Sequence, residues 1–273
     1  MSKKAGMVGL GLLMISCISI TANAEQRVAG ELKTKSGQEI GVTVSSYDYQ
    51  EPSLNVSLKA TKLGMDYKGA VALEEGWFIR GNFGYANGRA DYSGSGTLSA
   101  RPDWYYELRG MIGKDFDQGN YVISPYVGLG YRYLFNDLRG VSSTGASGYR
   151  RKSEYSYLPV GMTHQIKLES QAKLLTTLEY DHLISGQQTT YITDVTNLIA
   201  DQVNKQRHGY GIRGSVYYEK GSWSFGPWFQ YWNINQSAST TATVTLLGVT
   251  YNATFWEPKN KTTEIGLRFG YKF

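Results

Sequence analysis

The chain has 273 residues, of which 41% are hydrophobic, 19% charged and 14% aromatic, and its formal net charge is +5. A mean hydropathy of −0.36 excludes a bundle of transmembrane helices, and a single cysteine excludes a disulfide framework and any multi-cysteine metal site. The 32 glycines and 22 tyrosines, with only 6 prolines, are typical of an all-β protein with many turns.

Residues 1–24 have the features of a secretory signal peptide. Lys3 and Lys4 precede an apolar stretch, and Ala22-Asn23-Ala24 supplies a small-x-small cleavage site. A transmembrane anchor fits less well because the apolar core is short, and a lipoprotein anchor at Cys17 fits less well because Met14-Ile15 departs from a lipobox. Cleavage leaves residues 25–273 nearly neutral and without a thiol. We therefore predict an exported protein and no nucleic-acid partner.

Bulky apolar residues alternate with small or charged ones through the rest of the chain. The first such segment, 39–50, changes phase between Val44 and Tyr47, and we expect a β-bulge there. In 63–73 the odd positions are mostly apolar, whereas Asp66 and Lys68 lie on the other face of the predicted strand. The same alternation recurs at 77–85, 104–112, 121–133, 157–163, 174–181, 210–218, 223–231 and 264–273.

These segments predict ten strands of about 10 to 16 residues, much longer than the usual five or six and long enough to cross a bilayer at a tilt. Short connections at 74–76, 114–119, 166–171 and 219–222 alternate with long ones at 51–59, 87–102, 136–154, 186–206 and 237–261. Short inner turns and long outer loops are typical of a bacterial outer-membrane barrel. We predict an all-β, antiparallel transmembrane β-barrel of about ten strands, with eight or twelve as the alternatives.

The placement of aromatic residues separates this prediction from a soluble sandwich or lipocalin-like barrel. A membrane barrel carries aromatic girdles at both interfaces. We assign Trp77, Phe78, Tyr121, Trp223, Tyr271 and Phe273 to the girdle beside the short turns, and Tyr92, Tyr133, Tyr155 and Trp232 to the one beside the long loops.

The last segment, Gly266 to Phe273, resembles the C-terminal strand of Gram-negative outer-membrane barrels. In that class a terminal aromatic residue helps the assembly machinery to recognise the protein. The resemblance implies that Tyr271 and Phe273 form the assembly signal. It also implies an outer-membrane location, with membrane lipid, lipopolysaccharide and the barrel-assembly machinery as partners. It implies nothing about the oligomeric state.

Ten strands also resemble the omptin proteases, whose activity needs an Asp pair and an Asp-x-His pair. In this sequence Arg101 stands two residues before Asp103, so the Asp pair is missing. Asp181 and His182 are adjacent, and adjacent strand residues point to opposite faces. The pattern predicts Asp181 inside the barrel and His182 outside it.

Outer-membrane phospholipases and lipid A deacylases of the barrel class use a His-x-Ser motif. His164 resembles the start of that motif, but Ile166 stands where the nucleophilic serine is needed. We interpret His164 as an interior polar residue near the periplasmic end. The sequence thus predicts no catalytic residue, no metal and no cofactor. A protease or lipid-modifying enzyme stays as the least favoured alternative.

Charged residues on the predicted inward face are nearly balanced in sign. They are Asp66, Glu107, Glu179, Asp181 and Glu264 against Lys68, Arg80, Arg109, Arg132, Arg213 and Arg268. Buried charges are costly unless they are paired, and the lumen of a ten-stranded barrel is narrow. We predict a salt-bridge network that fills the lumen of a non-enzymatic protein, with a narrow channel for solutes or ions as the alternative.

Two features of the outer connections suggest contacts outside the barrel. Arg150, Arg151 and Lys152 form the densest basic cluster, which either binds lipopolysaccharide phosphates or is simply solvated. Residues 240–255 predict a hairpin that projects above the membrane and offers an adhesive or ligand-contact surface.

Overall fold

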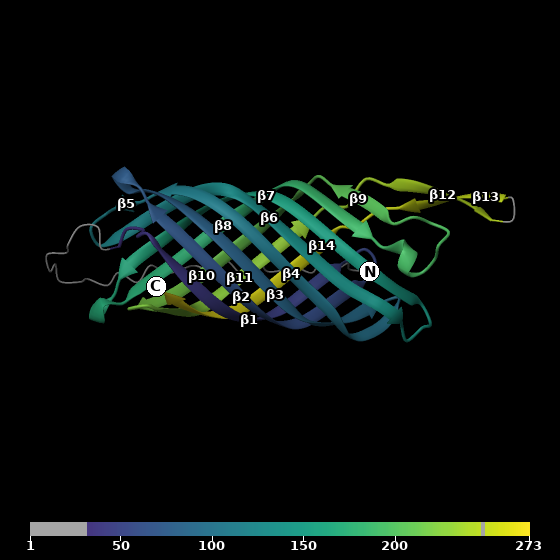
Figure 1. Cartoon of the computed structure of the whole chain (residues 1–273), viewed down its shortest axis with the longest axis horizontal. Helices are drawn as coiled ribbons and strands as arrows, with labels where there is room; N and C mark the ends of the chain where they lie inside the picture. Colours follow the sequence, from purple (N-terminus) through teal and green to yellow (C-terminus); the bar gives the residue numbers. More distant parts are fainter. Residues whose placement is uncertain (1–31, 247–248) are drawn as a thin grey trace, which may run out of the picture.

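The computed structural model describes residues 32–246 and 249–273, so the predicted signal peptide lies outside the described residues. Ten long antiparallel strands close into a barrel (Figure 1). They are β1 (Gly37–Glu51), β2 (Val56–Ala72), β3 (Trp77–Gly94), β4 (Gly96–Lys114), β6 (Tyr121–Val141), β7 (Ser147–Lys167), β8 (Lys173–Thr190), β10 (Gly209–Lys220), β11 (Trp223–Ile234) and β14 (Asn260–Lys272). Pairing of β8 with β10 and of β14 with β1 completes the closure.

The short connections lie where the alternation predicts them, at the end that holds the C-terminus. The 3-10 turn η1 (Glu74–Gly76) joins β2 to β3, η2 (Glu169–Gln171) joins β7 to β8, and the short β5 (Phe116–Asp117) precedes β6. By the convention of outer-membrane barrels this is the periplasmic end. The described residues contain no helix that is long and apolar enough to span a membrane.

Most of the predicted long loops are instead extensions of the strands. Residues 87–102 belong almost entirely to β3 and β4, which are separated only by Ser95, and residues 136–154 belong mainly to β6 and β7. These two last strands have 21 residues each, about twice what a tilted strand needs to cross a bilayer. The barrel therefore continues well beyond the membrane on its extracellular side.

Separate small elements complete the extracellular end. The turn η3 (Ile192–Asp194) and the short β9 (Gln202–Gln206) follow β8. The strands β12 (Thr240–Leu246) and β13 (Val249–Phe255) pair only with each other and extend past the barrel (Figure 1). The predicted hairpin at 240–255 is thus present.

An apolar belt covers the outside of the membrane-spanning part of the barrel, toward its periplasmic end. It forms because every second residue of each strand faces outward. It includes Val42, Leu63, Met65, Ile79, Leu108, Leu129, Val160, Leu178, Phe225 and Leu267, all exposed. Aromatic rings border the belt on both sides. Near the periplasmic end the ring centroid of Trp223 lies 4.7 Å from that of Tyr271, and near the outer end that of Trp104 lies 5.4 Å from that of Tyr133. The terminal Phe273 is also exposed.

Several aromatic residues lie inside the barrel and not where the sequence placed them. Phe78, Tyr155 and Trp232, which we assigned to the girdles, are 0%, 5% and 2% exposed. The expected bulge in β1 is absent, since its register with β14 is continuous and Tyr47 simply faces inward. For Tyr155 and Trp232 the reason is that the barrel above the membrane has a side-chain core of its own, which needs large apolar groups on the inward face. Phe78 follows the outward-facing Trp77, so it faces inward near the periplasmic end, where it packs with Met111 and Tyr126.

Candidate functional site in the barrel lumen

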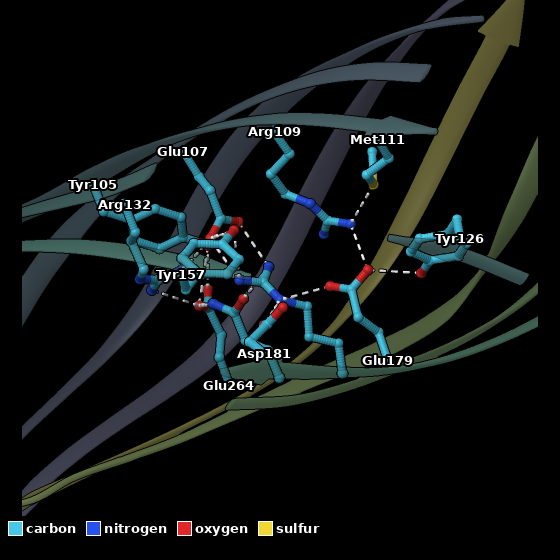
Figure 2. A network of polar contacts seen from close by, with 12 residues as sticks. Tyr105, Glu107, Arg109, Met111, Tyr126, Arg132, Tyr157, Glu179, Asp181 and Glu264 are labelled. Carbon is cyan, nitrogen blue, oxygen red and sulfur yellow. Dashed lines mark hydrogen bonds and ion pairs between the residues drawn. The ribbon is translucent and has the colours of Figure 1, made fainter. Parts of the chain in front are cut away.

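A layer of ion pairs crosses the lumen at the level of Glu107 (Figure 2). Arg213 on β10 binds Glu107 on β4 through both guanidinium NH2 groups, with nitrogen–oxygen distances of 2.5 and 2.7 Å. The Nε of Arg213 lies 2.5 Å from Asp181 and 3.3 Å from Glu179. One arginine therefore joins three carboxylates from two strands, so the walls of the barrel are tied together across its interior.

Arg132 and Glu264 extend the same layer. Arg132 is 1% exposed, and its guanidinium lies 3.9 Å from Glu107, 4.0 Å from Glu264 and 4.0 Å from the centroid of the Tyr105 ring. The Tyr105 hydroxyl donates to Glu264 at 3.0 Å, and the Ser45 hydroxyl donates to the same carboxylate at 2.6 Å. Arg132 and Glu264 are almost completely buried, and among the described residues the terminal nitrogens of Arg132 have ion-pair contacts but no hydrogen-bond acceptor.

The ring of Tyr157 lies in this layer because Gly130 makes room for it. Its hydroxyl donates to Glu107 at 2.7 Å. A Cβ at Gly130 would come within 2.2 Å of the Tyr157 ring, so any larger residue there would displace it. On the extracellular side of the layer the lumen holds an apolar cluster together with buried polar groups such as Lys62 and Asp103. The buried members of the cluster are Ala86, Tyr105, Leu134, Tyr155, Tyr157, Leu183, Trp232 and Ile234.

The other charges predicted for the lumen lie on the periplasmic side of this layer. Arg109 binds Glu179 at 2.6 Å, and Arg268 binds Asp66 at 2.6 Å. Lys68 and Arg80 contact aromatic rings instead: Lys68 lies 4.8 Å from the ring of Tyr217, and Arg80 lies 5.0 Å from the ring of Phe78.

Several charged residues of the interior were missed from the sequence, among them Glu39, Lys62 and Asp103. Glu39 binds Arg268, and Lys62 forms an ion pair with Asp103 in which both side chains are almost completely buried. Lys62 lies four residues before Asp66 and shares its inward phase. Extending the alternation by two repeats toward the N-terminus would therefore have found it. Asp103 likewise continues the inward phase of Glu107 and Arg109, just beyond the predicted connection at 87–102.

The space below the ion-pair layer is a cavity of about 1020 Å³. Glu107 and Arg213 form its upper end, whereas Ser36, Ser222 and Phe273 lie at its periplasmic mouth. The lumen is therefore divided along its axis into a cavity in the periplasmic half and a packed extracellular half.

The basic cluster at 150–152 is split by the alternation of β7. Arg150 faces outward and binds Asp194 at 2.7 Å, and Lys152 binds Glu154 at 2.9 Å. Arg151 faces inward and is 7% exposed, which corrects our expectation that it contacts lipopolysaccharide. The physical reason is that neighbouring residues of a strand cannot share a face.

Arg151 joins two carboxylates at the extracellular end of the lumen, beyond the membrane. It lies 2.8 Å from Glu51 and also binds Glu257, to which the Tyr49 hydroxyl donates at 3.3 Å. Burial, opposed by the charge of Arg151 and reinforced by that of Glu51, raises the pKa of Glu257 to about 7.

The histidines and aspartates that we compared with known barrel enzymes do not meet. His164 packs against Tyr121 on the outer surface, with ring centroids 5.3 Å apart, so our interior placement of it was wrong. It shares the outward phase of Val160 and Met162. His182 is exposed on the outside and Asp181 is buried inside, as the alternation predicts. Among the described residues no group of three or more potential ligands could hold a metal ion.

Comparison with protein-family models finds no match, and comparison with curated proteins finds none either. The chain is similar in structure to the outer membrane protease OmpT from Escherichia coli, with a TM-score of 0.53 and 11% identity over 88% of this chain and 98% of that one. It also matches the translocator domain of the autotransporter NalP from Neisseria meningitidis, with a TM-score of 0.42 and 11% identity over 88% and 90%.

Together, the closed ten-stranded barrel, its apolar belt and the two aromatic borders define a class of protein. The chain is a small β-barrel protein of the bacterial outer membrane. At 11% identity the likeness to OmpT extends to the fold alone.

Proposed function

We propose that this protein is a non-conducting, non-enzymatic outer-membrane barrel that acts through its extracellular end. The observation that carries the proposal is the layer formed by Glu107, Arg132, Arg213 and Glu264, whose members join opposite walls of the lumen. A charged layer of this kind supports a closed lumen because its ion pairs would have to separate before a solute could pass.

The extracellular half is suited to contacts with the surroundings. Its interior is packed, so it forms a rigid support, and the hairpin β12–β13 extends from it with Val249 and Tyr251 exposed. Exposed apolar side chains at the tip of a polar structure are typical of a binding surface. We further propose membrane lipid and lipopolysaccharide as neighbours of the exterior, and recognition of Tyr271 and Phe273 by the assembly machinery.

The experiment that tests this function is a single-channel recording of the refolded protein in planar bilayers. We expect no discrete openings, while heat-modifiable mobility in gels confirms that the barrel is folded. Reproducible openings in wild type would overturn the proposal.

A narrow channel is the second candidate, favoured by the cavity of about 1020 Å³ that already occupies the periplasmic half. The ion-pair layer, the apolar cluster and the buried ion pairs of Lys62 and Arg151 then separate this cavity from the extracellular side. In that case wild type conducts, and replacing Arg132 in the layer changes the conductance.

A further inference from the structure

The cavity below the ion-pair layer, which we call the vestibule, is unevenly charged. Ten basic and five acidic side chains line it. The inward face as a whole is nearly balanced, so the excess of positive charge is a property of this half of the lumen. Low-dielectric walls of one sign concentrate counter-ions in a cleft.

All five acidic residues of the vestibule already form ion pairs with basic residues. Glu39 and Asp66 bind Arg268, Glu179 binds Arg109, and Glu219 binds Lys272 at 2.5 Å. The fifth, Glu107, binds Arg213. Each of the five carboxylates of the lining is therefore already bound to an arginine or to Lys272.

Lys68 and Arg80 are the cations left over within the barrel. In residues 32–246 and 249–273, neither has a carboxylate within the 4 Å of an ion pair, and each contacts an aromatic ring. Carboxylates act on them only at longer range, Asp66 and Glu39 on Lys68 and Asp115 and Glu179 on Arg80. They lie on neighbouring strands: Lys68 is opposite Asn82, and Arg80 is opposite Ala70, so the two side chains are diagonal neighbours on the inward face. Like charges so close together repel each other, and an anion between them would relieve the repulsion.

The vestibule also has the dimensions of a ligand site. Its volume of about 1020 Å³ is at the upper end of the range for pockets that enclose small molecules. It is closed above by Glu107 and Arg213 and is accessible from the periplasmic end, where Lys35 and Lys220 also line it. A solute that enters from the periplasm would meet positive charge from the mouth to the closed end.

We propose that the vestibule binds a small organic anion from the periplasm, and that Lys68 and Arg80 hold its phosphate or carboxylate group. The ammonium supplies a point charge and the guanidinium supplies paired donors that match either group. This site is separate from the extracellular surface of the proposed function and does not depend on it.

The test is isothermal titration of the exported chain, folded in detergent micelles, with sodium pyrophosphate and with citrate at low ionic strength. The variant K68Q/R80Q removes the two cations. The matched control K59Q/R89Q makes the same change of charge on the same two strands, β2 and β3, at exposed positions. Gel mobility before and after heating shows whether each variant is folded.

We expect saturable binding of at least one probe by wild type, at least tenfold weaker binding by K68Q/R80Q, and unchanged binding by the control. Binding of pyrophosphate alone assigns a phosphate ligand, and binding of citrate alone assigns a carboxylate ligand. Absence of saturable binding of both probes would overturn the proposal, as would equal weakening by the two double variants.

A second measurement needs no variant. The amine of Lys68 in wild type is acylated with and without saturating anion, and the modified peptide is quantified by mass spectrometry. We expect the bound anion to protect Lys68 and to leave the exposed Lys59 unprotected. Equal modification of Lys68 in both samples would contradict the site.

Discussion

Arg213 and Glu107 form a bidentate ion pair across the barrel lumen, although 106 residues separate them in sequence. Their strands, β10 and β4, lie on opposite sides of the barrel. Asp181 and Tyr157 complete the surroundings of the pair, so its charges are satisfied without water. This contact closes the vestibule from above and carries the proposal of a non-conducting barrel.

Loss of the carboxylate at this contact should destabilise the barrel strongly. In E107Q the buried guanidinium of Arg213 keeps Asp181 and Glu179 but loses its bidentate partner, and breaking a buried pair costs about 3 kcal/mol or more. Urea unfolding in lipid vesicles measures the change. The control is D137N, at the ion pair with the exposed Arg139, where we expect a loss of about 1 kcal/mol at most. Equal effects of the two variants would contradict a buried layer.

The position of Tyr157 depends on the absence of a side chain at Gly130. We expect G130A to lower the free energy of unfolding by about 1 to 3 kcal/mol, because its methyl group would overlap the tyrosine ring. Gly110 is the matched control, since a Cβ there would meet nothing within 4 Å and G110A should change stability by less than about 0.5 kcal/mol. The same unfolding measurement applies. If G130A is as stable as G110A, the ring does not lie against Gly130.

The two faces of β11 should differ in their access to lipid. Trp223 is 50% exposed on the outside, whereas Trp228 lines the vestibule. In variants that keep one of these tryptophans and replace the others by phenylalanine, brominated lipids should quench the fluorescence of Trp223 and not that of Trp228. Iodide in the aqueous phase should quench Trp228, since a positively charged cavity attracts anions. Strong quenching of Trp228 by brominated lipid would place it on the lipid side.

Stability should fall as the pH rises through the range in which Glu257 titrates. Its pKa is about 7 in the folded protein, above the usual value of 4.5, so the folded state holds a proton that the unfolded state has already lost. The stabilising effect is complete below the unfolded value and is lost between about pH 4.5 and 7. We expect a higher urea midpoint at pH 5 than at pH 8, and a smaller difference in E257Q. An unchanged difference in that variant would assign the pH dependence to other groups.

Much of the barrel could be predicted from local alternation. The direction of a strand side chain depends only on whether its residue occupies an odd or an even position along the strand. That is why Leu63 and Leu267 were expected outside and Asp181 and Glu264 inside, and why ten strands were expected. The prediction was wrong at two positions where the alternation of neighbouring residues was not applied consistently. Tyr47 was interpreted as a bulge, and His164 was placed inside although its neighbours Val160 and Met162 set the opposite phase.

The sequence by itself determined the fold class, most of the lipid-facing residues and most of the charges that face inward. Only the tertiary structure decided the partners of those charges. Arg213 meets Glu107 while Lys68 and Arg80 have no carboxylate within ion-pair distance, because partner choice depends on the register between strands and on the height at which each side chain enters the lumen. Those quantities are set by closure of the whole barrel, which no single segment of sequence encodes.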